Sequence, residues 1–596
     1  MMAAFNKQKP RTCRSLFHNK SPVCLEYSLA IMWTTVLLTL STCFQICLVF
    51  ISQCLSVAAP ESEGMFRRLP WLDNISTSEP LQRNYGVAAA DVDLDGQIEW
   101  LVAGFTGPNY VLKYNAELNI LQNIAKTNIS LKSLLDPKGR AIGVCACDID
   151  GDGREEIYFL NTNDAYAGKS SYGDKLFKYR NGQYVNLFED EPNRRLEAKN
   201  YAGRSVACVD RFGSGKYAIA IATYSDSGTG CFALLEMDES HPYNNVETGY
   251  VVLRNAAKDA RIDRSTGGRG IVVGPILNND GRTDVFFGNE GNRHLNNKGE
   301  NFLFQNLGNG SFVDVAGVVG ISDENENVRG VAIADLNHDG LVDIVYGNWE
   351  GKHRVFIQEK SSGQTKFRNI AIEALEEPSL IRTVIVADFD NDRSSDIFFN
   401  NIYGMSSVQP NRLFTVKARK DASPLITPLN PGDALEEDGC GTGAGVADID
   451  NDGQLDLLVS HGESSAQPLR VYSVNIGGKN SWIRVVPRTK FGAPARGASV
   501  SMETSSGDQQ LSVIDGGSGY LCQMEPVAHF GLGKDTPVKM HVTWPDGRRV
   551  SRDLTENDSN TAHVIDHPDF VPPTSDIVSS RKVNVTLTKT KTHEEL

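Results

Sequence analysis

The chain has 596 residues, of which 40% are hydrophobic and 22% are charged, and it contains 54 glycines. A chain of this length is too long for a single hydrophobic core, so we expect several structural units. The net charge of −15 argues against nucleic acid and anionic membrane as partners, because both attract basic surfaces.

Residues 1–58 have the composition of an export leader. Basic residues outnumber acids before Tyr27, and no charged residue lies between Tyr27 and Pro60. We favour a signal peptide that is cleaved near the small residues Ser56-Val57-Ala58, with an uncleaved signal anchor as the alternative. Met32 is an alternative start that leaves a signal of more usual length. In every version the basic residues stay in the cytoplasm, so we predict that the remainder is exported.

After a predicted linker at residues 59–79, an acidic loop pattern recurs through residues 80–478. In the copy Asp148-Ile149-Asp150-Gly151-Asp152-Gly153-Arg154-Glu155-Glu156, acids fill the first, third, fifth and ninth places and glycine fills the sixth. Alternate residues of such a tight loop face inward, and glycine permits the sharp bend. Carboxylates this close together repel one another unless a cation is present, so each complete copy predicts a calcium (Ca2+) site. The predicted ligands are Asp91, Asp93, Asp95 and Glu99; Asp148, Asp150, Asp152 and Glu156; Asp335, Asn337, Asp339 and Asp343; Asp388, Asp390, Asp392 and Asp396; and Asp448, Asp450, Asp452 and Asp456.

Two further copies are incomplete. One keeps Asp210 and Gly215 without the other acids, and the other keeps Asn278, Asp280, Gly281 and Asp284 but has Ile276 in the first place. The loops are not EF-hands, because an EF-hand takes a glutamate from its twelfth place and lies between helices. The residues in the twelfth places of the five loops are Val102, Phe159, Tyr346, Phe399 and Val459.

The spacing of the copies predicts a β-propeller. The seven first places lie 53 to 66 residues apart, and a near-constant period is typical of a repeat architecture. The flanks are short apolar runs bounded by Gly, Asn and Asp, which are typical of buried strands. A period of this length fits four short strands, so we predict an all-β fold with a seven-bladed propeller, whose closure removes exposed sheet edges. A linear stack of repeats is the rival architecture.

Residues 479–566 break this period and predict a second, small all-β domain. Strands are expected at Trp482–Val486, Ala498–Met502, Leu511–Ile514 and Val538–Trp544. The polar tail from 567 to 596 is predicted to be disordered. Its last four residues, His593-Glu594-Glu595-Leu596, resemble a retrieval signal of the endoplasmic reticulum, so residence in that lumen is the alternative to secretion.

Six cysteines follow the leader, and an even number in an exported chain is compatible with disulfides. Cys145 and Cys147 lie on one face of a predicted strand, which is a poor geometry for pairing with each other and a good one for pairing with neighbouring strands. Free buried cysteines are the alternative. The remaining four are Cys208, Cys231, Cys440 and Cys522, and glycosylation sequons lie at Asn74, Asn128, Asn309, Asn557 and Asn584.

The repeats resemble the FG-GAP type of integrin α-subunit propellers, and the chain is more closely similar to the cartilage acidic protein family. The similarity is carried by stretches such as Ala146–Leu160, Ala202–Asp210 and Ser460–Ser464, and in the second domain by Asp515–Cys522 and Glu525–Gly533, which resemble the ASPIC (UnbV) domain. The resemblance implies a secreted, acidic, calcium-binding glycoprotein of extracellular matrix or neural tissue that acts through protein contacts. The resemblance implies that the predicted ligands in the five loops above bind calcium. It does not imply a ligand role for Asp210 or Ile276. The long family form ends in an EGF-like module, and we expect this chain to be the form without it.

Arg393 stands where the Asp388 loop should have glycine. That place often takes an unusual backbone angle, so we expect this loop to be strained or to bind calcium more weakly.

Three functions are weighed. The favoured one is a binding module in which calcium rigidifies the hairpin loops and the propeller recognises an extracellular or cell-surface protein, such as a neuronal receptor or a matrix component. The alternative is a glycan- or lipid-directed hydrolase or lyase, for which His461 is the best lone candidate, and His529 is expected to be structural. Neither a zinc His-Glu-x-x-His motif nor a Gly-x-Ser-x-Gly motif is present, so we predict that the protein is not an enzyme. A passive structural role is the third hypothesis.

Overall fold

The computed structural model describes residues 64–161, 172–196, 202–224, 232–245, 248–277, 280–291, 299–361, 363–403, 409–419, 422–475 and 480–571. They belong to one unit, Glu63–Leu596. The predicted leader, Cys231, Asn584 and the terminal His593–Leu596 lie outside these residues. Within the described ranges, no helix has the length and apolar character that a membrane span requires.

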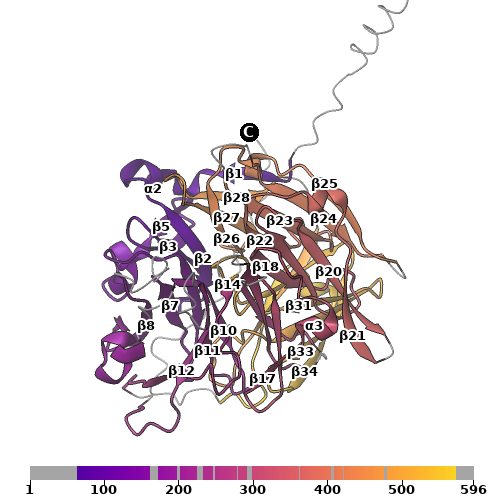
Figure 1. Cartoon of the computed structure of the whole chain (residues 1–596). Coiled ribbons are helices and arrows are strands. Elements are labelled where there is room, and N and C mark those ends of the chain that lie inside the picture. The colour runs from indigo at the N-terminus through magenta and orange to yellow at the C-terminus, as the bar shows by residue number, and fades with distance from the viewer. Residues whose placement is uncertain are drawn as a thin grey trace, which may run out of the picture. The chain divides into compact units, whose positions relative to one another are not determined.

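Between residues 66 and 474 the described chain forms seven four-stranded antiparallel sheets (Figure 1). The first strands are β2 (Asn84–Ala90), β6 (Gly143–Cys147), β10 (Ala202–Val209), β14 (Gly267–Gly274), β18 (Val328–Ala334), β22 (Ile381–Ala387) and β26 (Gly441–Ala447). Each first strand contacts the first strand of the next sheet, and β26 contacts β2. The sheets therefore close into the predicted seven-bladed propeller, and the all-β fold is confirmed.

The other strands of each sheet follow in chain order. The second strands are β3 (Glu99–Gly104), β7 (Glu156–Leu160), β11 (Ala218–Tyr224), β15 (Asp284–Glu290), β19 (Asp343–Asn348), β23 (Ser395–Asn401) and β27 (Asp456–His461). The third are β4 (Tyr110–Asn115), β8 (Lys175–Arg180), β12 (Ala233–Met237), β16 (Phe302–Asn306), β20 (Arg354–Ser361), β24 (Arg412–Lys417) and β28 (Arg470–Val474). The fourth are β5 (Ile120–Asn123), β9 (Gln183–Asn186), β13 (Leu253–Asn255), β17 (Phe312–Asp314), β21 (Gln364–Asn369) and β25 (Leu425–Leu429). Among the described residues, three short α-helices, α2 (Asp73–Ser78), α3 (Ala316–Val319) and α4 (Glu373–Glu376), and several 3₁₀ helices lie in connections.

The hydrophobic cores lie between neighbouring blades. Ala88 and Leu101 of the first blade pack in one cluster with Val144 and Phe159 of the second. Strands that are buried on both faces have continuous apolar sequences. β7 is such a strand, because all five of its residues are buried. Each blade is therefore stabilised by its two neighbours, as closure requires.

The fourth strand of the seventh blade comes from the other end of the chain. β1 (Phe66–Leu69) pairs antiparallel with β28, from Phe66↔Val474 to Leu69↔Val471, and Figure 1 shows β1, in indigo, beside the orange β28. The sequence predicts a linker at residues 59–79. In the structure this segment instead contains a strand that joins the first and last parts of the propeller, because pairing covers the otherwise exposed edge of β28.

One disulfide joins two neighbouring blades. Cys147 of β6 is bonded to Cys208 of β10, 61 positions later in the sequence. The prediction that this region pairs with a neighbouring strand is therefore confirmed for Cys147. Cys145, Cys440 and Cys522 are buried free thiols, which agrees with the alternative of free buried cysteines.

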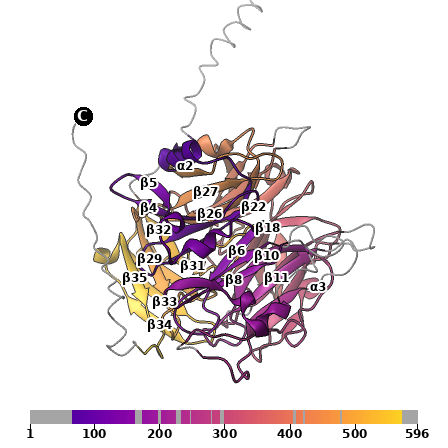
Figure 2. The same ribbon diagram turned by 90° about the vertical axis from the view of Figure 1, so that its left-hand side faces the viewer.

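Residues 481–565, for which the sequence predicts a second β domain, form two further sheets within the same unit, and their strands are orange to yellow in Figure 2. One sheet has the order β31 (Gln509–Val513), β30 (Ser499–Thr504), β33 (Pro537–Thr543) and β34 (Arg549–Asp553). The other has the order β32 (Ala528–Gly533), β29 (Ser481–Pro487) and β35 (Thr561–Ile565). Their apolar faces share one core that includes Ile483, Val500, Phe530 and Trp544.

A connection of this second domain, the axial segment (residues 515–525), runs along the inner strands of the propeller. Gln523 exchanges backbone hydrogen bonds with Val87 and Ala89 of β2, at 2.9 and 3.1 Å. Gly519 bonds with Val331 of β18, 2.8 Å from the Val331 N–H to the Gly519 carbonyl. A Cβ atom on Gly517 would lie 2.5 Å from Cβ of Ala207, so the close approach requires glycine.

Candidate metal centres

Each acid loop joins the first strand of a blade to the second, and hydrogen bonds within the loop fix its shape. The carboxylate of Asp148 accepts the backbone N–H groups of Asp152, at 3.2 Å, and Gly153, at 2.9 Å. Glu156, in the ninth place, accepts the N–H of Ile149 at 2.8 Å. The same contacts recur in the loops that begin at Asp91, Asp335 and Asp388.

The two loops without a full acid set keep part of this frame. Asp210 accepts the N–H groups of Ser214 and Gly215 at 2.8 and 2.7 Å. Asp284, in the ninth place of the fourth blade, accepts the N–H of Leu277 at 2.7 Å. Asp280, in the fifth place of the same loop, accepts the N–H of Arg282 at 3.0 Å. Part of the hydrogen-bonded frame therefore persists in loops whose acid set is incomplete.

Among the described residues, four groups of three carboxylates place one oxygen each within 4.8 Å of one another. Four predicted ligands from the same loops, Asp95, Asp152, Asp396 and Asp456, fall outside these groups. The groups are Asp91, Asp93 and Glu99; Asp148, Asp150 and Glu156; Asp388, Asp390 and Asp392; and Asp448, Asp450 and Asp452. All the donors are hard oxygen atoms, which is the ligand type that calcium prefers.

The Asp335 loop does not form such a group. The amide nitrogen of Asn337 donates to the carboxylate of Asp339 at 2.9 Å, so this side chain presents a donor where a calcium ligand needs an oxygen. His338, in the fourth place, lies 3.0 Å from Asp508 of the second domain. As it stands, this loop fits a cation less well than the other four.

A lysine ammonium lies among the acids of the first two blades. In the second blade, Nζ of Lys178 is 3.0, 2.7 and 2.9 Å from carboxylate oxygens of Asp150, Asp152 and Glu156. The side chain of Lys178 is fully buried. In the first blade, Lys113 makes the same three contacts with Asp93, Asp95 and Glu99, at 2.9, 2.6 and 2.9 Å. The ammonium groups of Lys113 and Lys178 therefore neutralise part of the negative charge of these two acid groups.

The register of the sheets shows which residue of the third strand lies opposite the ninth-place acid in each blade. Among the described residues, this residue is a lysine in the first two blades. Ile157 pairs with Phe177 and Trp100 pairs with Leu112, so each lysine lies opposite the ninth-place acid. The corresponding residues are Thr415, which pairs with Asp396 in the sixth blade, and Ser473 in the seventh. The spacing of the acid loops gives no sign of these lysines, which lie on the third strands, although alignment of the third strands of the repeats reveals them.

We expect Lys178→Met to make the second blade dependent on calcium. The buried carboxylates of Asp150 and Glu156 then lack a counter-charge, and an unpaired buried charge destabilises the fold. The melting temperature in chelator should fall below that of the unmodified chain, and calcium should raise it by a larger increment. Lys132→Met, at an exposed lysine, is the control. An unchanged calcium increment in Lys178→Met would contradict the role given to this lysine.

The acids of the sixth and seventh blades lack a lysine and repel one another. Burial, followed by Asp390 and Asp392, raises the pKa of Asp388 well above its ordinary range. Burial and neighbouring carboxylates raise the pKa of Asp390 to about 6 and that of Asp450 to about 7. Crowded carboxylates with raised pKa values are the environment that a divalent cation relieves, so these two groups fit calcium best.

The effect of calcium on stability is expected to grow with pH. In chelator, the folded state holds the protons of Asp390 and Asp450 more tightly than the unfolded state does, so stability declines as pH rises through about 6 to 7. Calcium binds the deprotonated acids and removes this decline. Melting temperatures with calcium and with chelator, measured from about pH 5.5 to about pH 7.5, should diverge as pH rises. A constant difference would count against these carboxylates as ligands.

The second domain contacts the acid loops of several blades. Arg484 of β29 donates to Asp448 at 2.7 Å and also pairs with Glu525. Arg393 has an unusual backbone angle, as expected, with φ of 79° in the left-handed region. Its guanidinium donates to Ser506 at 3.1 Å and pairs with Asp535, so contacts with the second domain compensate the strain of a non-glycine residue at this place.

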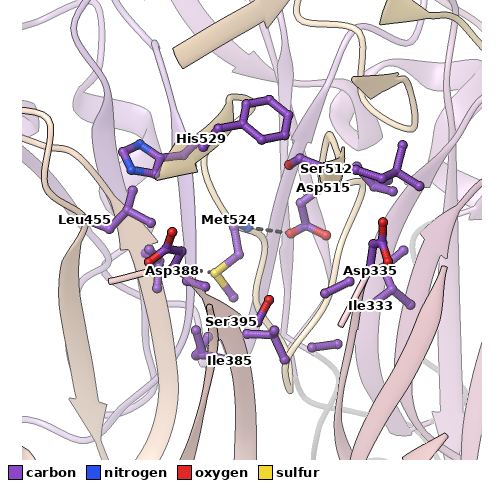
Figure 3. A pocket seen from close by; sticks show the side chains of 18 of the residues that line it. Ile333, Asp335, Ile385, Asp388, Ser395, Leu455, Ser512, Asp515, Met524 and His529 are labelled. Carbon is purple, nitrogen blue, oxygen red and sulfur yellow. Dashed lines mark hydrogen bonds between the residues drawn. The ribbon is translucent and has the colours of Figure 1, made fainter. Parts of the chain in front are cut away.

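A cavity of about 170 Å³ lies where the fifth and sixth acid loops meet the second domain (Figure 3). Asp335 and Asp388 line it on the propeller side, and Asp515, Met524 and His529 line it on the other. Nε2 of His529 is 2.6 Å from the amide oxygen of Asn391. Burial lowers the pKa of His529 to about 3, so the imidazole is neutral at physiological pH. This histidine joins the two domains, as its expected structural role implies.

The side chain of His461, the lone catalytic candidate, is part of a buried hydrogen-bond network. Its Nδ1 lies 2.6 Å from the carbonyl of Pro468 and its Nε2 lies 3.2 Å from both carboxylate oxygens of Glu436. Glu436 also pairs with Arg470 at 3.1 Å, and His461 is only 1% exposed. The geometry is that of a structural hydrogen-bond network, because His461 is buried and no face of its imidazole is open to a substrate.

Comparisons with known proteins agree with this architecture. Residues 277–346 and 335–399 match the FG-GAP-like repeat, and residues 489–570 match the family described as ASPIC and UnbV. Solved structures with similarity include the Dos1 propeller, at TM-score 0.34 and 13% identity, covering 69% of this chain and 94% of that one. The SapL1 lectin in complex with alpha methyl fucoside has TM-score 0.32 and 9% identity, covering 59% and 97%. The fold assignment rests on the sheet topology and not on these weak similarities.

Sequence relatives cover more than four fifths of the chain. Cartilage acidic protein 1 of Xenopus tropicalis is 53% identical over 515 residues, which are 86% of this chain and 78% of the relative. The Mus musculus protein of the same name is 53% identical over 494 residues, covering 82% and 75%. The Homo sapiens protein is 52% identical over 520 residues, covering 85% and 77%. This chain therefore belongs to the cartilage acidic protein family.

Proposed function

We propose that this protein is a secreted, calcium-binding glycoprotein of the extracellular space that acts as a protein-interaction module. The observation that carries the proposal is the pair of convergent acid groups in the sixth and seventh blades, which have all-oxygen donors and no lysine of their own. Membership of the cartilage acidic protein family supports the secreted location. The exposed sequons at Asn309 and Asn557 support glycosylation.

Calcium is proposed to have a structural role. Extracellular calcium modules bind with dissociation constants of about 10⁻⁴ to 10⁻³ M, so these sites would be largely filled outside cells. A filled site relieves the repulsion among Asp388, Asp390 and Asp392 and rigidifies a loop that also contacts the second domain through Arg393. The ion thereby holds together the surfaces that a partner would recognise.

The proposed partner is an extracellular or cell-surface protein, such as a neuronal receptor or a matrix component. The family resemblance and the acidic net charge of −15 support a protein partner over nucleic acid. The alternative enzymatic function has no support in the buried pairs of His461 and His529 described above.

Calorimetric unfolding with millimolar calcium and with chelator tests the calcium sites. A site filled at ten times its dissociation constant contributes about 1.4 kcal/mol, so two sites should raise the melting temperature by a few degrees. The variant Asp388→Asn/Asp390→Asn should lose about half of this increment. The variant Asp553→Asn, at an exposed carboxylate, should keep it. Absence of any calcium increment would refute the proposed sites.

A further inference from the structure

Two of the seven first strands are less covered at their ends than the other five. The last two residues of β18, Ile333 and Ala334, are half-buried, and so are the last two of β22, Val386 and Ala387. In the other five blades both corresponding residues are buried. The same four residues line the cavity of about 170 Å³ described above. The packing of the second domain on the propeller therefore leaves a space next to the fifth and sixth blades.

This cavity has room for a small organic molecule. An engineered cavity of about 150 Å³ in another protein binds benzene. Apolar residues form much of the wall here, and Figure 3 shows Leu455, Ile385 and Ile333 around Met524. Apolar walls and this volume fit a ligand whose body has roughly six to ten non-hydrogen atoms.

Four carboxylates also line the cavity. Glu525 pairs with Arg484 of the second domain. Asp335, Asp388 and Asp515 form no ion pair with any residue that the structure describes. Calcium in the Asp388 loop would offset only part of this charge, because three carboxylates converge there. A carboxylate that is removed from bulk water and has no counter-charge attracts a cation.

The basic residues in the wall already have acidic partners that do not line the cavity. His338 lies 3.0 Å from Asp508. Arg393 pairs with Asp535 and lies 3.5 Å from Asp508. The charges of these two side chains are therefore directed to the second domain, and the three carboxylates remain without a cation in the space itself.

Two further details favour a ligand that donates hydrogen bonds. Asp515 is held in the wall by the axial segment, because it accepts the N–H of Met524 at 2.6 Å (Figure 3). The amide nitrogen of Asn391 donates to the carbonyl of Gly453 at 2.9 Å, so the amide oxygen of Asn391 accepts from Nε2 of His529. Nδ1 of the neutral imidazole is then an acceptor, and it has no partner among the described residues.

We propose that this cavity binds a small organic cation, with its ammonium group on Asp515 and its apolar body against the fifth and sixth blades. Hydrogen bonds between an ammonium and a carboxylate are charge-assisted and strong. The ammonium supplies the counter-charge that Asp335 and Asp515 lack, and the apolar body fills the space that the second domain leaves open. The site takes an organic ligand and leaves the calcium ligands in their role, so it goes beyond the proposed function.

Isothermal titration of the full chain in millimolar calcium tests the site with three probes. Benzylammonium chloride has both an apolar body and an ammonium group. Benzyl alcohol has the same number of non-hydrogen atoms without the charge, and ammonium chloride has the charge without the body. Benzylammonium should bind saturably, and benzyl alcohol should bind about tenfold more weakly or less, because it cannot form the charge-assisted bond. Ammonium chloride should show no saturable binding.

Ser512→Leu is designed to fill the cavity. Ser512 lies on β31 in the wall and is half-buried, and the larger side chain should weaken benzylammonium binding about tenfold or more. Ser551→Leu makes the same substitution at an exposed serine on β34 of the same sheet, and should bind as the unmodified chain does. Asp515→Asn should weaken the binding of benzylammonium and leave that of benzyl alcohol unchanged.

Ser512→Leu keeps the proposal testable where Asp515→Asn fails to fold, because Asp515 also holds the axial segment and Ser512 does not. Three results overturn the proposal: no saturable binding of benzylammonium, equal binding of benzyl alcohol, or equal binding in Ser512→Leu and the unmodified chain. A repeat of the titration in chelator gives a fourth. Binding that appears only in chelator would place the amine in the empty acid loops, whereas binding in both media supports the cavity. The calcium increment of the melting temperature is measured separately, so either proposal can fail without the other.

Discussion

Replacing Arg496 with methionine is expected to destabilise the protein by about 3–5 kcal/mol, because it breaks a fully buried ion pair. Arg496 belongs to the second domain and is 0% exposed. Its Nε donates to Glu155 of the second acid loop at 2.6 Å. Its other nitrogens donate to the carbonyls of Asp515, at 2.9 Å, and Ala89, at 3.0 Å. One side chain thus joins two blades and the axial segment.

The pH dependence of the variant gives a further expectation. Burial raises the pKa of Glu155, and Arg496 opposes that shift. Without Arg496 the pKa of Glu155 rises further, so the folded variant holds a proton on this carboxyl that the unfolded chain releases. Its stability is therefore expected to be better preserved at acidic pH and to decline as pH rises through the folded-state pKa.

Calorimetry and limited proteolysis measure this outcome, with Arg549→Met as the exposed control. The double variant Glu155→Gln/Arg496→Met should recover part of the lost stability, because it removes the unpaired buried charge. Cleavage between the propeller and the second domain should become faster in Arg496→Met. A melting temperature equal to that of Arg549→Met would show that this pair does not hold the domains together.

Truncating Phe66 to alanine is expected to cost about 3–5 kcal/mol, the usual range for a buried phenylalanine. Phe66 is 1% exposed and packs edge-on against Phe389 and Phe398, with ring centres 4.9 and 6.2 Å away. The same residue anchors β1 on β28, so its loss frees an edge of the seventh blade. Exposed edges pair with other chains, and we expect self-association as well as a lower melting temperature.

Arg67→Ala is the matched control for this strand. Its side chain is exposed on the neighbouring position, and surface substitutions usually change stability by less than about 0.5 kcal/mol. Chemical denaturation gives the stability difference, and size-exclusion chromatography gives the association state. If Phe66→Ala behaved as Arg67→Ala does in both measurements, β1 would not be the strand that closes the propeller.

The repeats of the propeller could be predicted because their signal is local. An acid loop with its glycine marks the turn between the first two strands, and the period of 53 to 66 residues then sets the number of blades. The strands of the second domain could be predicted for the same reason, since apolar alternation and the Pro545-Asp546-Gly547 turn lie within a few residues of each other.

The remaining features depend on residues that are far apart in sequence. β1 has only four residues, and nothing in Phe66–Leu69 identifies β28 as its partner. The axial segment contains Gly516, Gly517 and Gly519, a composition typical of an exposed loop, although the segment is buried in the propeller. Loop spacing also could not reveal Lys178, because the lysine reaches the acids from the third strand.

The axial segment also constrains how the protein can be made. Synthesis proceeds at about 5–20 residues per second from the N-terminus, and Gln523 lies 436 positions after its partner Val87. For roughly 20 to 90 s, β2 therefore lacks backbone partners that the ribosome has not yet produced. A nascent chain that stops before Gly516 would carry every blade and still leave Val87 and Val331 without the hydrogen bonds they make in the finished molecule. Completion of the propeller is thus a late event, controlled by a part of the chain that follows it.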